Sequence, residues 1–304
     1  MKEISKSQTI VSQGTRPTQR LPEWLKIKRR INDDYGRVRS ILKQHGIHSV
    51  CQEAHCPNIR ECFGRGTATF MILGDICTRN CRFCGVSSGI PGPLDIEEPV
   101  RLAEVVAKLN LKQVVITSVT RDDQPDGGAG IFVSTMKELR ARDKNVRVEF
   151  LISDLAGNTE ALAVIIDSGV DVLAHNVETV GRLYSAARPG ASLSRSLDLL
   201  RAISVHTPRP VVKTGFMVGL GETLDEIEML LRQVHDVGVD IVTIGQYLRP
   251  SVNHLSVERF YTPDEFEMLA ETGRKIGIAH VESGPLVRSS YRAFDQSKGF
   301  LGRL

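Results

Sequence analysis

Long hydrophobic runs are missing from this sequence of 304 residues. A membrane-spanning helix needs roughly 18 to 20 consecutive apolar residues, and no run approaches that length. No apolar segment of the secretory kind follows the first residues either. We therefore expect a soluble, cytoplasmic protein with no membrane partner.

A strong excess of one charge is also absent. The 39 Lys and Arg residues against 36 Asp and Glu give a net charge of only +3. Domains that bind nucleic acid usually carry a marked basic excess on one face. The charge balance therefore argues against a nucleic-acid partner.

Cysteine is absent from most of the chain, because all six cysteines lie between Cys51 and Cys84. A chain of this length buries a large core and needs neither disulfides nor a structural metal to fold. Six cysteines could form three disulfides, but such frameworks belong to short secreted scaffolds. Metal ligation that serves function is the better interpretation of the cluster.

The N-terminal region divides into two predicted parts. Residues 1–20 are polar, rich in hydroxyl groups and without hydrophobic periodicity, which predicts a mobile N-terminal arm. An organelle transit peptide is an alternative, although Glu3 and the short length argue against it. Residues 21–67 form a predicted N-terminal extension, and within it Leu21 to Gln44 reads as one or two amphipathic helices.

From Ala68 onward, short apolar runs alternate with helical patterns. The predicted strands are Thr69 to Leu73, Gln113 to Thr117, Val146 to Ile152, Asp171 to Ala174, Val211 to Val218 and Asp240 to Gly245. The predicted helices are Pro99 to Leu109, Ile131 to Arg142, Thr159 to Ser168, Leu193 to Val205 and Leu224 to Val237. Such alternation predicts an α/β fold with a parallel sheet, either open and doubly wound or closed into a complete or partial barrel.

The second cysteine triplet follows the first predicted strand. Cys77, Cys81 and Cys84 have the spacing CxxxCxxC. Three thiolates on one loop can hold three irons of a four-iron, four-sulfur cluster and leave the fourth iron open. Structural zinc is the weaker alternative, because no His or Cys follows until His175.

This triplet, with Phe83 before its last cysteine, resembles the signature of the radical S-adenosylmethionine (radical SAM) superfamily. The resemblance implies a partial (β/α)6 TIM-type barrel with N-terminal and C-terminal extensions. It also implies that SAM binds the open iron and yields a 5′-deoxyadenosyl radical. The cofactor then supplies the chemistry, and the protein positions the substrate and excludes water.

The first triplet, Cys51, Cys56 and Cys62, is spaced CxxxxCxxxxxC and precedes the predicted barrel. A zinc knuckle that adds His55 is one interpretation, but His55 adjoins Cys56 and would rarely face the same ion. A second cluster is favoured, and its fourth ligand must come from elsewhere in the chain.

Both triplets together resemble the lipoyl synthase family. Other stretches that match it include HNVET at 175 to 179, RPGA at 188 to 191, GLGET at 219 to 223 and SGPLVRSSY at 283 to 291. The resemblance implies that Ser290 is the fourth ligand of an auxiliary cluster, since an alkoxide binds iron more weakly than thiolate and suits a cluster that is dismantled. The predicted division is a barrel over residues 68–260 and a C-terminal extension over 261–304.

The implied reaction inserts two sulfur atoms, at carbons 6 and 8 of a protein-bound octanoyl-lysine. The implied cofactors are two 4Fe–4S clusters and SAM, with the auxiliary cluster as the sulfur source. The implied partners are octanoylated lipoyl carrier domains of the glycine cleavage H protein and of 2-oxoacid dehydrogenase acyltransferase subunits, a ferredoxin or flavodoxin, and an iron–sulfur carrier.

Three residues are candidate SAM contacts. Asn176 and Glu178 follow a predicted strand, where they could hold the ribose or the amino group. Helix capping is an equally good explanation for them. Arg195 could bind the cofactor carboxylate through two hydrogen bonds, although a solvated helix face explains it nearly as well.

Two other functions stay open at this point. A different radical SAM enzyme could use the second cluster for electron transfer and keep it intact. A zinc-binding nucleic-acid module is the alternative from another class, and the balanced charge argues against it.

Overall fold

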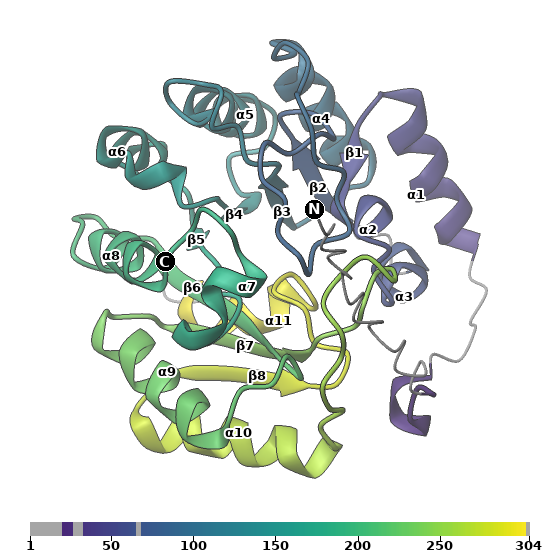
Figure 1. The fold of residues 1–304 in the computed structure, drawn as a ribbon. Coiled ribbons are helices and arrows are strands. Elements are labelled where there is room, and N and C mark those ends of the chain that lie inside the picture. The colour runs from purple at the N-terminus through teal and green to yellow at the C-terminus, as the bar shows by residue number, and fades with distance from the viewer. Residues whose placement is uncertain (1–19, 27–32, 65–67, 302–304) are drawn as a thin grey trace, which may run out of the picture.

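The computed structural model describes residues 20–26, 33–64 and 68–301. Its centre is a curved sheet in which the strands lie in chain order, β1 to β8 (Figure 1). β1 pairs antiparallel with β2, and the strands from β2 to β8 are all parallel. The strands are β1 (His48–Ser49), β2 (Thr69–Ile72), β3 (Gln113–Ser118), β4 (Arg147–Leu151), β5 (Val172–Ala174), β6 (Val211–Val218), β7 (Ile241–Gln246) and β8 (His280–Gly284).

Helices cover the outer side of the sheet, as Figure 1 shows for α4 to α6 and α8 to α10. One of these six helices follows each strand from β2 to β7, which gives the six β/α units of the predicted partial barrel. The barrel helices are α4 (Glu98–Lys108), α5 (Ala129–Arg142), α6 (Thr159–Asp167), α8 (Leu193–Ser204), α9 (Leu224–Asp236) and α10 (Pro263–Ile276). The shorter or flanking helices are η1 (Glu23–Leu25), α1 (Asp33–Gln44), α2 (Val50–Glu53), α3 (Ile59–Gly64), η2 (Leu155–Gly157), η3 (Gly181–Leu183), α7 (Tyr184–Ala187) and α11 (Ala293–Leu301).

All six predicted strands are present, and the five predicted barrel helices are confirmed within a few residues. Sequence analysis missed β1 because it has two residues, and β8 because its sequence HVESG contains no apolar run. The helical segment predicted from Leu21 to Gln44 is present as η1 and α1, with residues 27–32 outside the described part. The predicted arm, residues 1–20, also lies outside it except for Arg20.

Strand alternation separates an apolar layer from a polar barrel interior. On β4, Val148 and Phe150 are fully buried, and the ring of Phe150 packs edge-on against Phe132 of α5. Between them Glu149 points to the opposite face, as the two-residue period requires, and meets Lys213 of β6 at 2.7 Å. The hydrophobic core therefore lies between sheet and helices, and the barrel interior holds a buried ion pair.

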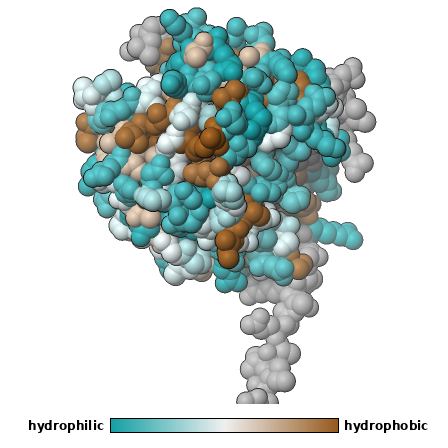
Figure 2. Space-filling model, turned by 90° about the horizontal axis from the view of Figure 1, so that it is seen from above, coloured by the Kyte–Doolittle hydropathy of each residue, from teal (hydrophilic) through white to brown (hydrophobic). Residues whose placement is uncertain are grey.

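The surface is mostly hydrophilic on the face that Figure 2 shows, with apolar residues gathered in a few patches. Among the described residues, no helix has the length and apolarity of a bilayer span, and the longest helices, α5 and α10, have 14 residues each.

Helix α11 covers the end of the barrel at which the strands begin. Ser297 donates a hydrogen bond to Gln113 Oε1 (3.0 Å) at the start of β3, and Arg147 at the start of β4 donates to the carbonyl of Leu301 (3.3 Å). Loops at the opposite, carboxyl-terminal ends of the strands stay free to form a site.

Candidate functional site

The loop with Cys77, Cys81 and Cys84 leaves the carboxyl-terminal end of β2 and leads to α4. Its backbone folds back on itself, because the amide of Cys77 donates to Ser87 O (2.8 Å) and its carbonyl accepts from the amide of Gly89 (2.9 Å). Two further backbone amides point at the Cys77 sulfur, from Arg79 (3.4 Å) and from Thr120 (3.3 Å). Hydrogen bonds of this kind tune the potential of cluster-bound sulfur.

The three thiols of this loop lie within electrostatic range of one another. Burial, with smaller effects from Cys81, Glu178 and Cys77, raises the pKa of Cys84 to about 12. Burial also raises the pKa of Cys81, where Glu178 and Cys77 add to the effect and Arg188 opposes it. Cys81 and Cys84 therefore hold their protons until a metal displaces them. The donor set, with amides aimed at one sulfur, fits three corners of a cubane cluster.

An ion-pair network holds the loop to the next two strand ends. Arg79 pairs with Asp122 through two hydrogen bonds (2.7 and 2.8 Å), and its third nitrogen lies 2.7 Å from Asp154. Asp154 is fully buried. Burial opposes its ionisation, but the charge and hydrogen bond of Arg79 outweigh that effect and hold its pKa below the usual value. The network makes the position of the cysteine loop depend on residues that follow β3 and β4.

Arg195, a candidate cofactor contact, belongs to this network in the structure. Its guanidinium lies 3.1 Å from Asp154 and donates to Gly190 O (3.2 Å). Its assignment to the SAM carboxylate stays a prediction.

Asn176 and Glu178 lie beyond β5, beside the cysteine loop. Glu178 has a left-handed backbone (φ 65°), which is strained for a non-glycine residue. Burial raises its pKa, against the opposing effects of Arg188 and of a hydrogen bond from Asn176. The amide oxygen of Asn176 is buried and has no hydrogen-bond partner in the described part of the chain. A strained residue and an unpaired buried oxygen at one strand end are typical of a ligand site.

His175 has a structural position instead. Its ring lies between Ile152 O and Ser196 Oγ, both at 2.9 Å. Burial lowers its pKa to about 4, so the ring is neutral at pH 7.

The first triplet lies outside the parallel strands, on α2, α3 and the turn between them. Cys51 is buried, and its amide donates to Ser49 Oγ (3.2 Å), the N-cap of α2. The amide of Cys56 donates to Cys51 O (3.0 Å). Burial and the neighbouring Cys51 raise the pKa of Cys56, and Arg288 opposes this. Cys62 lies in α3, where its amide donates to Asn58 O (2.9 Å).

The segment after β8 packs against this triplet. Asn58 donates a side-chain hydrogen bond to Leu286 O (2.6 Å), and the Tyr291 hydroxyl donates to Glu61 (3.1 Å). Ser290 is held from β2, since Thr69 Oγ1 donates to its Oγ at 2.8 Å. The fold thus joins two motifs more than 220 residues apart, and the joined set of three thiols and one hydroxyl fits a second cluster.

The zinc alternatives gain no support from this geometry. His55 is exposed, with a left-handed backbone (φ 51°). Within residues 20–26, 33–64 and 68–301, no three His, Cys, Asp or Glu side chains, those of the two cysteine triplets included, are gathered closely enough to bind one single metal ion.

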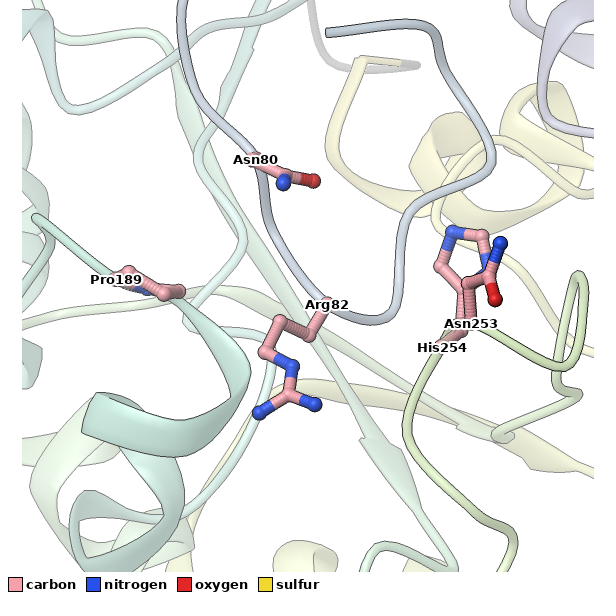
Figure 3. Close-up of a pocket in the computed structure, with 5 residues that line it drawn as sticks. All are labelled: Asn80, Arg82, Pro189, Asn253 and His254. Carbon is pink, nitrogen blue, oxygen red and sulfur yellow. The ribbon is translucent and has the colours of Figure 1, made fainter.

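Two cavities flank the second cysteine loop. The first, of about 410 Å³, is lined by Asn80, Arg82, Pro189, Asn253 and His254, and Figure 3 shows these side chains around it. His254 bonds to the carbonyl of Cys84 (2.9 Å). The second, of about 380 Å³, lies beyond β3 and β4 and includes Thr120, Asp122 and Gly127 in its lining. Residues of the cysteine loop line the first cavity, and residues that hydrogen-bond to the loop line the second.

Comparisons with known proteins agree with this geometry. The sequence matches the Radical SAM superfamily over residues 71–234. It is 51% identical to the lipoyl synthase of Symbiobacterium thermophilum, over 97% of this chain and 92% of that protein. It is 52% identical to the lipoyl synthase of Caldanaerobacter subterraneus subsp. tengcongensis, over 91% of this chain and 96% of that protein. The chain belongs to the lipoyl synthase family.

Solved structures support the fold. The crystal structure of Streptococcus suis SuiB bound to precursor peptide SuiA has a TM-score of 0.54 at 12% identity, and the match covers 85% of this chain and 56% of that one. The FeFe-hydrogenase maturase HydG from Carboxydothermus hydrogenoformans has a TM-score of 0.52 at 13% identity, covering 88% of this chain and 70% of that one. The predicted radical SAM α/β fold is thus confirmed, and the chain is a radical SAM enzyme of the family that uses SAM and a 4Fe–4S cluster.

Sequence reasoning missed several residues of the site. Arg79, Asp154, Arg188, Thr69 and Asn58 were not singled out, although Arg79 lies inside the CxxxCxxC loop and Arg188 opens the RPGA stretch. Asn58 and Thr69 also lie in stretches that match the family, CPN at 56 to 58 and ATFMILGDICTRNC at 68 to 81. The motifs were therefore available as a signal for four of these residues, and only for Asp154 do contacts between distant segments alone reveal the role.

Proposed function

We propose that this enzyme completes the lipoyl cofactor by inserting sulfur at carbons 6 and 8 of a protein-bound octanoyl-lysine. Cys77, Cys81 and Cys84 would hold the cluster that binds SAM. Cys51, Cys56, Cys62 and Ser290 would hold a second cluster that supplies the sulfur. When bound, the first cluster and SAM supply a radical that removes hydrogen from unactivated carbon, which no acid, base or nucleophilic side chain can do.

The chain's own residues would position these groups. Asn176 and Glu178 would receive the ribose or amino group of SAM, which the unpaired Asn176 oxygen supports. The Arg79 network would keep the cysteine loop fixed against the strand ends. Burial of the thiols would limit the access of water to the radical.

One observation carries this proposal above the others. The C-terminal segment with Ser290 packs on the region of the first triplet, through Asn58 and Thr69. A radical SAM enzyme with a single cluster has no need of this contact between its C-terminal segment and the first cysteine triplet.

The partners follow from the reaction and the site. The substrate would be an octanoylated carrier domain, from the glycine cleavage H protein or a 2-oxoacid dehydrogenase acyltransferase subunit. Electrons would come from a ferredoxin or flavodoxin, and an iron–sulfur carrier would rebuild the second cluster. Arg82 lies in the loop from Cys77 to Cys84, is exposed and lines the first cavity, and its positive charge supports the approach of an acidic electron-donor protein there. With these partners the enzyme would act in the cytoplasm.

An anaerobic single-turnover assay tests the proposal. Reconstituted enzyme, reductant and SAM are incubated with an octanoyl-lysine peptide, and the peptide mass, the 5′-deoxyadenosine and the enzyme-bound sulfide are measured. We expect the peptide to gain two sulfur atoms while the enzyme loses bound sulfide. SAM cleavage with an unchanged peptide, or product formation with all cluster sulfide retained, would contradict the proposal.

A further inference from the structure

Thr69 is a buried residue to which neither motif assigns a role. It opens β2 and is 6% exposed. Its hydroxyl donates a 2.8 Å hydrogen bond to Ser290 Oγ, across 221 positions of sequence.

The backbone of Thr69 is fixed by the sheet. In the parallel ladder Thr69 lies opposite Val115 of β3. On the other side of β2, the next residue, Phe70, lies opposite Ser49 of β1, and Ser49 caps the helix that carries Cys51. The backbone that carries the hydroxyl is thus held by β3, at the start of the strand that follows the first triplet and pairs with β1.

Ser290, in contrast, lies in irregular backbone between β8 and α11. The turns around it are closed by Val287 N to Gly284 O (3.1 Å), Tyr291 N to Arg288 O (2.9 Å) and Ala293 N to Ser290 O (3.3 Å). None of these bonds orients the serine side chain. Its direction is therefore set by the contact with the sheet.

We propose that Thr69 is a positioning residue for Ser290, which rests on the proposed role of Ser290 as a ligand of the second cluster. Thr69 fixes the serine oxygen toward the first triplet and keeps a hydrogen bond to it when that oxygen binds iron. A metal-bound serine oxygen has no proton to donate, so in the bound state Thr69 must be the donor, a role that its hydroxyl can take at this distance. Hydrogen bonds to a negatively charged acceptor are also the stronger ones.

The test compares three variants in the full-length enzyme. Thr69→Val keeps the branched shape and removes the donor, Thr69→Ala removes both, and Thr69→Ser keeps the donor. Loss of a group that supports a metal ligand typically reduces affinity or activity about 10-fold to 100-fold. We therefore expect Thr69→Val and Thr69→Ala to release iron from the second cluster to a chelator about 10-fold faster and to lose the Mössbauer signature of the serine-bound iron.

Two controls separate this role from a structural one. SAM cleavage and the thermal unfolding of the cluster-free chain should stay near wild type in Thr69→Val, and Thr69→Ser should restore slow iron release. Wild-type iron release and an unchanged serine-bound iron signal in both Thr69→Val and Thr69→Ala would overturn the inference. Iron release from Thr69→Ser as fast as from Thr69→Val would also overturn the inference.

A further variant separates this inference from the proposed function. In a Ser290→Ala background, Thr69→Val should have no additional effect on iron release. If Ser290→Ala leaves the spectrum of the second cluster unchanged, the ligand assignment itself is wrong. If Ser290→Ala alters that spectrum and the Thr69 variants do not, the proposed function stands and only the role of Thr69 fails.

Discussion

The loop from Cys77 to Cys84 is surrounded by charged groups from neighbouring strand ends, whereas the segment from Cys51 to Cys62 lies outside the parallel strands and is covered by the far end of the chain. Asp122 and Asp154 hold the first of these loops through Arg79. The segment from Cys51 to Cys62 is instead covered by the C-terminal segment, whose Leu286 carbonyl bonds to Asn58 and whose Ser290 hydroxyl bonds to Thr69.

This difference suggests how one chain can treat two clusters differently. A loop fixed by buried ion pairs from adjacent strands has several rigid neighbours and keeps its geometry through repeated turnovers. A segment closed by the C-terminal part of the chain, with the proposed hydroxyl ligand, would be able to open and release its cluster. The predictions below would break or sharpen this comparison.

Removing one cysteine from each loop gives the largest expected contrast. Cys77→Ala should abolish reductive cleavage of SAM, because the SAM-binding cluster loses one of three ligands. Cys51→Ala should leave cleavage measurable and abolish sulfur insertion. The readouts are 5′-deoxyadenosine and peptide mass, with folding checked by circular dichroism. Equal loss of cleavage in both folded variants would show that the two loops do not divide the work.

Ser290→Ala tests the proposed part of the C-terminal segment in holding the second cluster. We expect sulfur insertion to fall at least about 10-fold, as for a lost metal-ligand interaction, while SAM cleavage stays near wild type. Ser289→Ala is the matched control, since it changes the adjacent hydroxyl of the same motif. Full lipoyl formation by Ser290→Ala would remove this residue from the ligand set.

Asp154→Asn tests the charged surroundings of the other loop. Removing one partner from a buried ion pair typically destabilises a protein by roughly 3 to 5 kcal/mol, and the displaced loop should slow SAM cleavage by about 10-fold to 100-fold. The control is Asp122→Asn, whose carboxylate is 36% exposed, with an expected loss of about 1 kcal/mol or less. Chemical denaturation and cleavage rates check both. If Asp154→Asn and Asp122→Asn lowered stability and the cleavage rate equally, burial of the carboxylate would not decide how strongly each residue holds the loop.

Asn58→Ala weakens the contact between the first triplet and the C-terminal segment. Leaving the partly buried Leu286 carbonyl without its donor should destabilise the fold by about 1 to 2 kcal/mol. Iron release from the second cluster should accelerate, with no change at the SAM-binding cluster. Asn145→Ala, on an exposed turn, serves as the control and should alter neither property.

A pair remote from both cysteine loops provides the smallest effect. A hydrogen bond from Arg182, with the Thr223 amide, lowers the pKa of Glu226 from 4.5 to about 2. A carboxylate with a depressed pKa stabilises the fold above its unfolded value, so this contribution should fade as the pH falls from 4.5 toward 2. Glu226→Gln keeps a residue that can complete the capping box but loses the charge beside Arg182 and near the helix N-terminus. It should therefore lower the free energy of unfolding at pH 7 by about 0.5 to 1 kcal/mol and weaken its dependence on pH between 4.5 and 2, without altering iron content. If the free energy of unfolding of Glu226→Gln depended on pH between 4.5 and 2 as it does in the wild type, the stabilising role of the Glu226 carboxylate would be contradicted.

Much of the barrel could be predicted because its strands are apolar runs and its helices have clear starts. Thr223 with Glu226 and Thr262 with Glu265 form the two capping boxes that their spacing indicates. β8 escaped prediction since Glu282 and Ser283 make its sequence polar. Its strand character comes from pairing with β7, which no local pattern reveals.

The site was predictable to the extent that its chemistry is local. The cysteine spacings indicate iron–sulfur ligation directly, and Asn176 and Glu178 follow a strand end that the pattern located. Arg195 shows the limit, because its helix position suggested a free guanidinium and the structure pairs it with Asp154. That partner lies 41 positions earlier, on the loop after another strand.

The sequence by itself indicated the kind of chemistry, since two cysteine triplets at these spacings favour metal clusters, and it determined the β/α alternation that builds the barrel. The tertiary structure decided which side chains serve each triplet. Parallel strands bring their carboxyl ends to one rim and so join Arg79, Asp122 and Asp154. The return of the chain after β8 sets Ser290 against Thr69, a contact whose sequence separation no local pattern encodes.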